Sequence, residues 1–77
     1  MIMEYKTKFR INELVHERGI SLRELARLSD IEPSIINKMA NNKRISVYFQ
    51  HLERIAEALE LDDVNEIIYF EKTKEKS

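Results

Sequence analysis

The sequence has no cysteine, and it has only one glycine and one proline among its 77 residues. Without cysteine the chain can form no disulfide, no thiolate nucleophile and no cysteine-ligated zinc site, which fits a reducing cytosol. Turns between strands draw heavily on glycine and proline, so their scarcity argues against a sheet-rich fold. No apolar run approaches the roughly 20 residues of a membrane span. We therefore expect a cytoplasmic protein with no membrane partner.

The residues that are present favour one small packed domain. Hydrophobic residues make up 43% of the chain, which is typical of a globule, and this length has room for one core. We expect a single domain over residues 1–77, with its core over 9–69 and a polar tail over 71–77.

The net charge is −1, but the charges are unevenly distributed along the chain. Residues 1–44 carry nine basic and six acidic residues, and residues 45–77 carry four basic and eight acidic residues. The N-terminal half is the one suited to face a polyanion.

Hydrophobic periodicity and capping signals predict an all-α fold, a compact bundle of five helices near residues 9–18, 22–29, 33–41, 47–59 and 63–69. Gly19 ends the first helix, because the residue after a helix commonly needs a positive φ. Ser21 and Glu24 have the spacing of a capping box, in which each side chain bonds the other's backbone N–H. Pro33 suits the first position of the third helix.

The last two helices have weaker starts. Ser46 is the expected cap of the fourth helix, in which Phe49 begins a wide apolar stripe. Asp63 and Glu66 resemble a second capping box, with Asp63 as the cap of the fifth helix. Residues 1–8 alternate apolar and polar side chains, which indicates either a half-buried strand or an unstructured start.

Several short motifs follow one another in a fixed order. They are Leu14-x-x-Glu17-Arg18-Gly19-Ile20-Ser21, Glu24-Leu25-Ala26, Ile31-x-x-Ser34-x-Ile36-x-x-Met39, Lys43-Arg44 and Leu52-x-Arg54-Ile55-Ala56-x-Ala58-Leu59. Each piece is common, but the series at these spacings resembles the lambda-repressor and Cro-like (XRE) helix-turn-helix DNA-binding family over residues 10–68. Two short helices with a tight break between them place the second helix in a DNA major groove.

The resemblance implies a role for each matching position. Helix 33–41 would read bases through Pro33, Ser34, Ile35, Asn37 and Lys38. Phosphate contacts would come from Arg23, Asn41, Lys43 and Arg44. Lysine can donate to guanine, asparagine can pair with adenine, and isoleucine can touch a thymine methyl group. The alternative interpretation is that these side chains form an ordinary solvated helix face and an ordinary polar loop.

The sequence also departs from the family pattern. Leu22 stands where many members have a phosphate-holding glutamine, and Glu32 puts a negative charge at the start of the reading helix. Asp30, Asn42 and Glu60 stand where the family often has glycine. Asparagine and aspartate tolerate a positive φ, but glutamate does so less readily. We therefore expect the turn after helix 47–59 to be rebuilt, with a backbone conformation that differs from the family's glycine turn.

These observations favour a sequence-specific DNA-binding transcriptional regulator, a repressor, that binds double-stranded DNA as a homodimer. The alternative is a protein-interaction module on the same fold, such as an antitoxin or an antirepressor. We expect no catalytic residue and no cofactor, because the small bundle shows no nucleophile–base pair and no convergent carboxylates. We expect no metal site, because His16 and His51 are isolated.

Four consecutive large apolar residues mark the predicted dimer interface: Ile67, Ile68, Tyr69 and Phe70. An antiparallel pairing of this segment with residues 1–7, within or between subunits, would cover both apolar edges. Alternatively, Ile68 and Tyr69 close the core of the monomer, and the dimer forms only on DNA.

Overall fold

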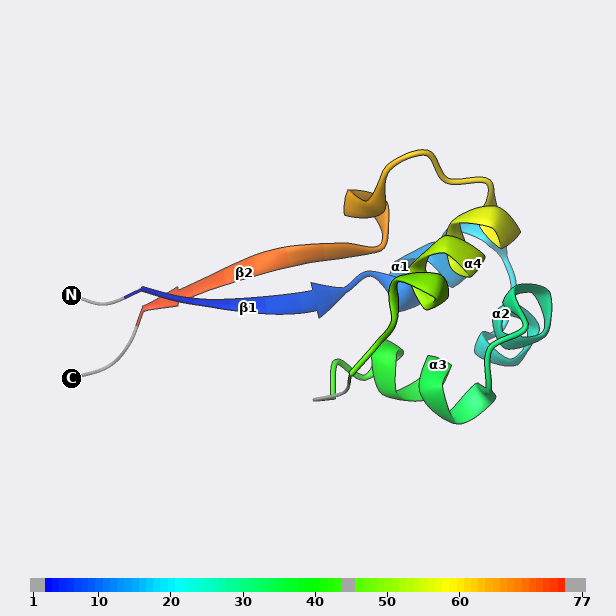
Figure 1. Cartoon of the computed structure of the whole chain (residues 1–77), viewed down its shortest axis with the longest axis horizontal. Helices are drawn as coiled ribbons and strands as arrows, with labels where there is room; N and C mark the ends of the chain where they lie inside the picture. Colours follow the sequence, from blue (N-terminus) through cyan, green and yellow to red (C-terminus); the bar gives the residue numbers. More distant parts are fainter. Residues whose placement is uncertain (1–2, 44–45, 75–77) are drawn as a thin grey trace.

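The computed structural model describes residues 3–43 and 46–74, and these form a helical body with a long two-stranded ribbon extending from it (Figure 1). The elements in chain order are β1 (Met3–Phe9), α1 (Ile11–Arg18), α2 (Leu22–Ser29), α3 (Pro33–Ala40), α4 (Phe49–Leu59), the 3-10 turn η1 (Val64–Glu66) and β2 (Ile68–Lys74). The molecule measures 44 × 24 × 23 Å, and the ribbon lies along its long axis.

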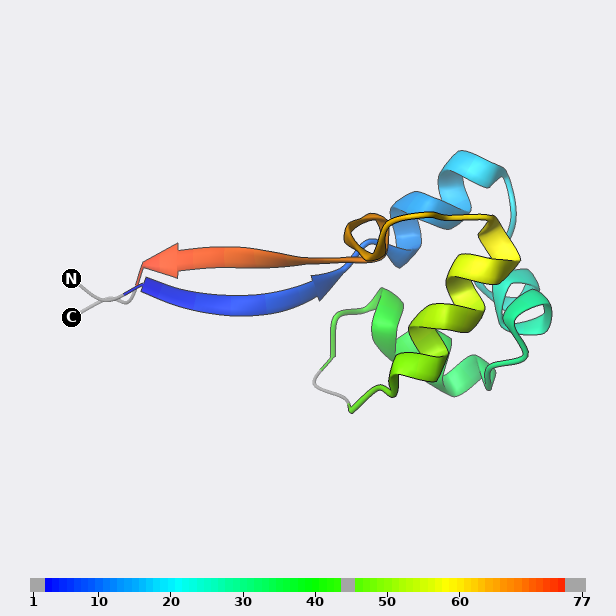
Figure 2. The same ribbon diagram turned by 45° about the horizontal axis from the view of Figure 1, so that its top comes forward.

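The ribbon joins the two ends of the described chain. β1 and β2 pair antiparallel, with Phe9 opposite Ile68, Thr7 opposite Phe70 and Tyr5 opposite Lys72 (Figure 2). This confirms the strand interpretation of the N-terminal alternation and the expected pairing, which occurs within one chain. Residues 71–74, assigned from the sequence to a polar tail, form the outer half of β2, and residues 75–77 lie outside the described residues.

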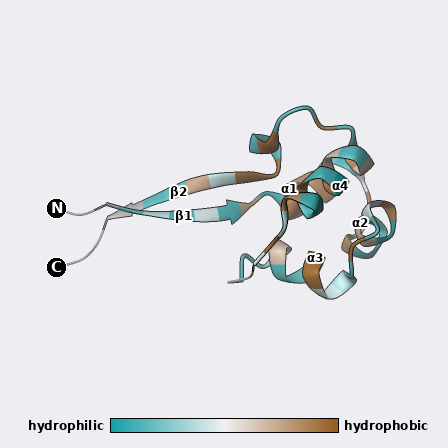
Figure 3. Ribbon diagram, viewed as in Figure 1, coloured by the Kyte–Doolittle hydropathy of each residue, from teal (hydrophilic) through white to brown (hydrophobic). Residues whose placement is uncertain are grey.

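The core sits where the four helices meet, and the apolar colours in Figure 3 gather on the helical body. Each helix contributes side chains spaced three or four residues apart, because this spacing puts them on one face. The fully buried large side chains are Ile11, Leu25, Ile36, Met39, Ile55 and Ile67. Ile67 comes from the connection between η1 and β2, so the segment that leads into the ribbon also closes the core.

The prediction of a fifth helix over residues 63–69 was wrong, because the described chain has four α-helices and a single 3-10 turn in this place. The expected cap is present: the Asp63 carboxylate accepts a hydrogen bond from the Asn65 N–H at 2.9 Å. The turn ends once Ile67 is buried. The next three residues, Ile68 to Phe70, are β-branched or aromatic, which favours a strand, and they extend to pair with β1.

The start of α4 also differs from the prediction. The helix begins at Phe49 rather than Val47, and its cap is Tyr48 rather than Ser46. The His51 Nδ1 atom accepts a hydrogen bond from the Tyr48 N–H at 3.3 Å, which satisfies a donor at the helix start. Phe49 is 82% exposed, so the apolar stripe of this helix begins at Leu52 and does not include Phe49.

The helix ends keep the left-handed conformation that the family pattern assigns to glycine. Gly19, Asp30, Asn42 and Glu60 have φ values of 65°, 57°, 55° and 55°. The turn after α4 is therefore not rebuilt, and Glu60 adopts the conformation in spite of its side chain. A left-handed backbone costs a residue with a Cβ atom about 1–2 kcal/mol. The backbone hydrogen bonds that close the turn offset this cost at Glu60, among them the one from the Leu61 N–H to the Ala56 carbonyl oxygen at 2.8 Å.

We expect Glu60→Gly to raise the free energy of unfolding by about 1 kcal/mol, because glycine relieves the left-handed strain at this position. Gly19→Ala should lower it by a similar amount, since an added Cβ at Gly19 meets no atom within 4 Å and only the backbone strain would act. Denaturant titration of the two variants and the wild type measures both changes. A loss of stability in Glu60→Gly would show that the Glu60 side chain contributes more than its backbone costs.

Candidate nucleic-acid interface

The helices α2 and α3 form a helix-turn-helix whose break is fixed by hydrogen bonds. The Ser21 Oγ atom accepts a hydrogen bond from the Glu24 N–H at 3.0 Å, which confirms Ser21 as the cap of α2. At the other end of α2, Arg54 Nη1 donates to the Asp30 carbonyl oxygen at 3.1 Å. Pro33 then opens α3 with Glu32 as its cap. Because α4 holds the turn through Arg54, the direction of α3 is set by the helical body.

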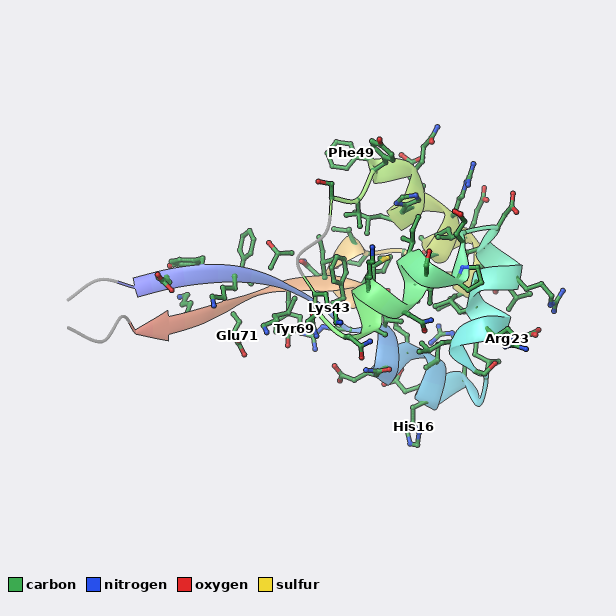
Figure 4. All side chains as sticks on the ribbon, turned by 90° about the horizontal axis from the view of Figure 1, so that it is seen from below. His16, Arg23, Lys43, Phe49, Tyr69 and Glu71 are labelled. Atoms are coloured by element: carbon green, nitrogen blue, oxygen red, sulfur yellow. The ribbon has the colours of Figure 1, made fainter. Side chains whose placement is uncertain are left out.

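One face of α3 belongs to the core and the other is open to solvent. Ile36, Met39 and Ala40 are buried against the other helices. Ser34 and Asn37 are exposed, as are Pro33 and Lys38. In the view from below, α3 lies at the front of the helical body (Figure 4). An uncovered helix with small polar and basic side chains on its free face has the shape and chemistry to enter a major groove.

Ile35 is the one predicted base-reading residue that the structure does not leave fully exposed. Its side chain is half-buried and packs against the core. The part of Ile35 that reaches solvent is therefore the only part available to a thymine methyl group. The remaining four predicted base-reading residues lie on the exposed face of α3.

The predicted phosphate contacts lie at opposite ends of this unit. Arg23 is exposed in the first turn of α2, and Lys43 is exposed just beyond α3, at the base of the ribbon (Figure 4). Asn41, which ends α3, is also exposed. Arg44 lies outside the described residues. Of the predicted phosphate contacts, one basic side chain thus lies exposed in the first turn of α2 and one just beyond the end of α3.

A neighbouring arginine is paired within its own helix. The Arg27 guanidinium binds the Glu24 carboxylate, and this hydrogen bond lowers the pKa of Glu24 and raises the pKa of Arg27. The Glu24 carboxylate thus binds Arg27 rather than the Ser21 N–H, so only the Ser21 half of the predicted capping box is made. Arg23, one turn earlier, makes no ion pair within the part of the chain that the structure describes, and it remains the predicted phosphate contact of α2.

Two asparagines connect α3 to the rest of the molecule, and sequence reasoning missed both. Asn42 Oδ1 accepts a hydrogen bond from the Phe9 N–H at 2.7 Å, which connects the end of α3 to the ribbon. Asn12 Nδ2 donates to the Ala40 carbonyl oxygen at 3.0 Å and satisfies the last turn of α3. The glycine-like position of Asn42 was visible in the sequence, but its partner is 33 residues away.

Comparison with known families agrees with this geometry. Residues 10–73 match the model of the Cro/C1-type HTH DNA-binding domain. The chain belongs to this family. No curated protein and no solved structure matches the chain significantly. Membership of the Cro/C1-type family confirms the resemblance seen in the sequence and shows a helix-turn-helix domain of a DNA-binding class.

In this Cro/C1-type domain, part of the predicted dimer interface is buried within the single chain. Ile67 is 1% exposed and lies in the core of its own chain, and Ile68 is half-buried against that core. Tyr69 is half-buried beneath Arg10, whose guanidinium carbon lies 4.2 Å from the ring centre. Phe70 alone is largely exposed, at 69%. Of the four residues, Phe70 offers the most surface to a second subunit.

The two histidines have separate surroundings in the Cro/C1-type domain. His16 is exposed on α1 (Figure 4). His51 accepts the hydrogen bond at the start of α4. Within residues 3–43 and 46–74, no group of three histidine or acidic side chains is placed to hold a metal ion. In the same part of the chain, every helix is too short or too polar to span a bilayer.

Proposed function

We propose that this protein is a sequence-specific transcriptional repressor that inserts α3 into the DNA major groove and binds its operator as a homodimer. The observation that carries the proposal is the exposed strip of Ser34, Asn37 and Lys38 on a helix whose opposite face is the core of a helix-turn-helix. A domain of this size that occupies a duplex acts most simply by excluding other proteins from the same site, which is repression.

The chemistry of the strip supports base reading. The Lys38 ammonium can donate to guanine O6 and N7, and the Asn37 amide can pair with adenine N6 and N7. Phosphate binding by Arg23, Lys43, Asn41 and, by family position, Arg44 would fix the register without reading sequence. Two copies would place their α3 helices about 34 Å apart, in successive major grooves on one side of the duplex.

Selection of bound duplexes from a random pool tests this function and identifies the operator. We expect enrichment of a sequence with two half-sites in inverted repeat, because a symmetric dimer reads a symmetric site. A pool that yields no enriched sequence, at salt low enough for electrostatic binding, would contradict the proposal.

We expect Lys43→Ala to weaken binding to all duplexes alike and to lower the slope of log affinity against log salt by about one, because one phosphate contact is lost. Asn41→Ala is the matched control, since it removes a neutral phosphate ligand and should leave the slope unchanged. Fluorescence anisotropy over a range of salt concentrations measures both. A change of base preference in Lys43→Ala would instead place Lys43 at a base edge.

A specific surface favours the alternative, a protein-interaction module such as an antitoxin or antirepressor. Tyr48 and Phe49, consecutive residues at the start of α4, are 71% and 82% exposed. Phe49 points away from the helical body (Figure 4). Exposed aromatic pairs are typical of protein interfaces. A salt titration on random duplex DNA separates the two functions, because a pure protein-binding module shows no affinity that falls steeply with salt.

A further inference from the structure

We propose that two copies of this chain pair edge to edge through β1, in an antiparallel register centred on Tyr5, so that their ribbons form one four-stranded sheet. This inference rests on the homodimer of the proposed function, and it assigns the dimer interface to the exposed edge of β1. The occupant of the β1 edge is a second copy of the same strand, and it is identified by backbone geometry, charge and aromatic side chains.

Backbone hydrogen bonds show which groups of β1 face outward. The Phe9 N–H donates to Asn42, away from β2, whereas the Arg10 N–H donates to the Ile67 carbonyl oxygen at 2.7 Å. Neighbouring residues of a strand alternate in direction, so Tyr5 and Thr7 direct their N–H and C=O groups outward like Phe9. Within residues 3–43 and 46–74 these backbone groups of Tyr5 and Thr7 have no hydrogen-bond partner, so they form a free edge that can pair with another strand.

The free edge lies along an open groove. The groove has a volume of about 700 Å³ and runs between residues 5–9 of β1 and Asn42, Lys43 and Val47 beyond α3. A two-stranded ribbon is marginally stable alone in water, and a wider sheet is needed to stabilise it away from the helical body. A partner strand seated on this edge would enter the groove and widen the sheet.

Charge selects the register of the two strands. If the same face of both ribbons lies on the same side of the joint sheet, even-numbered residues of one β1 strand pair with even-numbered residues of the other, and odd with odd. Centring on Glu4 would set Glu4 against the partner's Glu4, and centring on Lys6 would set Lys6 against the partner's Lys6. Centring on Tyr5 sets Glu4 against the partner's Lys6, twice by symmetry. These are non-hydrogen-bonded pairs, in which side chains approach most closely.

Aromatic side chains favour the same register. Tyr5 and Phe70 are 58% and 69% exposed on one face of the ribbon, in edge-to-face contact with ring centres 6.1 Å apart. Pairing Tyr5 with the partner's Tyr5 would line up four rings across the sheet and cover apolar surface that the single chain leaves in water. The two-fold axis would pass through this pair, so the two α3 helices would be related as an inverted repeat requires.

A cross-linking experiment tests the centre of the register, because the natural chain has no cysteine and a single introduced thiol is unambiguous. In the Tyr5→Cys variant the two thiols would lie on directly opposite residues, about 5.5 Å apart between Cα atoms, which suits a disulfide. The Thr7→Cys variant is the matched control. Its thiols would lie four residues apart along the strands, roughly 13 Å, which is too far to bridge.

Under mild oxidation without DNA we expect a covalent dimer from Tyr5→Cys and little or none from Thr7→Cys. Equal yields from both variants would overturn the register. Circular dichroism of both reduced variants checks that the helical body is folded, because both positions are exposed in the ribbon and remote from the core.

Charge reversal provides a second test that does not depend on Tyr5. Glu4→Lys and Lys6→Glu, each alone, should raise the dimer dissociation constant about tenfold, because each places two like-charged pairs across the interface. The double reversal restores both charge pairs across the interface and should recover most of the affinity. Part of the loss remains because Lys6→Glu sets a carboxylate opposite Glu71 within its own ribbon. In a register centred on Lys6, Glu4 would face the partner's Lys8. The double reversal would then place like charges at both positions, and its dimer would be as weak as those of the single variants or weaker.

Sedimentation without DNA at micromolar concentrations measures these constants. A monomeric wild type, or a double reversal that fails to recover, overturns the inference. Because DNA is absent from the measurement, a dimer that pairs as expected but selects no duplex would contradict the proposed function and leave the pairing intact.

Discussion

Replacing Lys38 by alanine is expected to weaken binding to the selected operator by about 1–3 kcal/mol and to relax the preference at one base pair. Lys38 lies on the exposed face of α3, and its helix is held in direction by the Arg54 hydrogen bond to the turn. A lysine in this place can donate to two acceptors of guanine, and no other base offers both in the major groove.

Competition binding with operators changed at single positions measures this effect. The matched control is Lys43→Ala, which removes a charge of the same sign beyond the end of α3 and should weaken all duplexes alike. If both variants lost affinity uniformly over all duplexes, Lys38 would contact phosphate and the assignment to a base edge would be wrong.

The second large effect is expected for stability. Ile36→Ala should lower the free energy of unfolding by about 2–5 kcal/mol, because the Ile36 side chain is fully buried and its removal leaves a cavity. A domain of this length has a total stability of roughly 4–12 kcal/mol. The variant should therefore unfold at much lower denaturant concentration or fail to fold at physiological temperature.

Ile35→Ala is the matched control, since it makes the same change at the preceding position of α3. Ile35 is half-buried, so its loss should cost clearly less stability and should reduce operator affinity if Ile35 contacts a thymine methyl group. Thermal and denaturant unfolding compare the two variants. Equal losses would show that Ile35 packs as tightly as Ile36, which would leave it no part in base reading.

The sequence by itself determined the helix-turn-helix. The expected limits of α2, residues 22–29, agree with the structure, as does the start of α3 at Pro33. These elements could be predicted because their signals are local: Ser21 caps a donor three residues away, and Pro33 fixes its own φ. The exposed position of Ser34, Asn37 and Lys38 followed in the same way, since the buried face of one helix defines its open face.

Only the tertiary structure decided the ends of the chain and the surroundings of the site. The sequence indicated both a helix over residues 63–69 and a pairing of residues 67–70 with residues 1–7. The choice between them depended on β1, about 60 residues away in the sequence, which a local pattern cannot weigh against helix formation. Phe49 looked like a core residue by its spacing, but α4 begins there and the core is filled by other side chains. Asn42 came to hold the ribbon because its partner, the Phe9 N–H, lies 33 residues away in the sequence. Glu60 kept a glycine conformation because its turn is closed by backbone hydrogen bonds, and these outweigh the preference of a single residue.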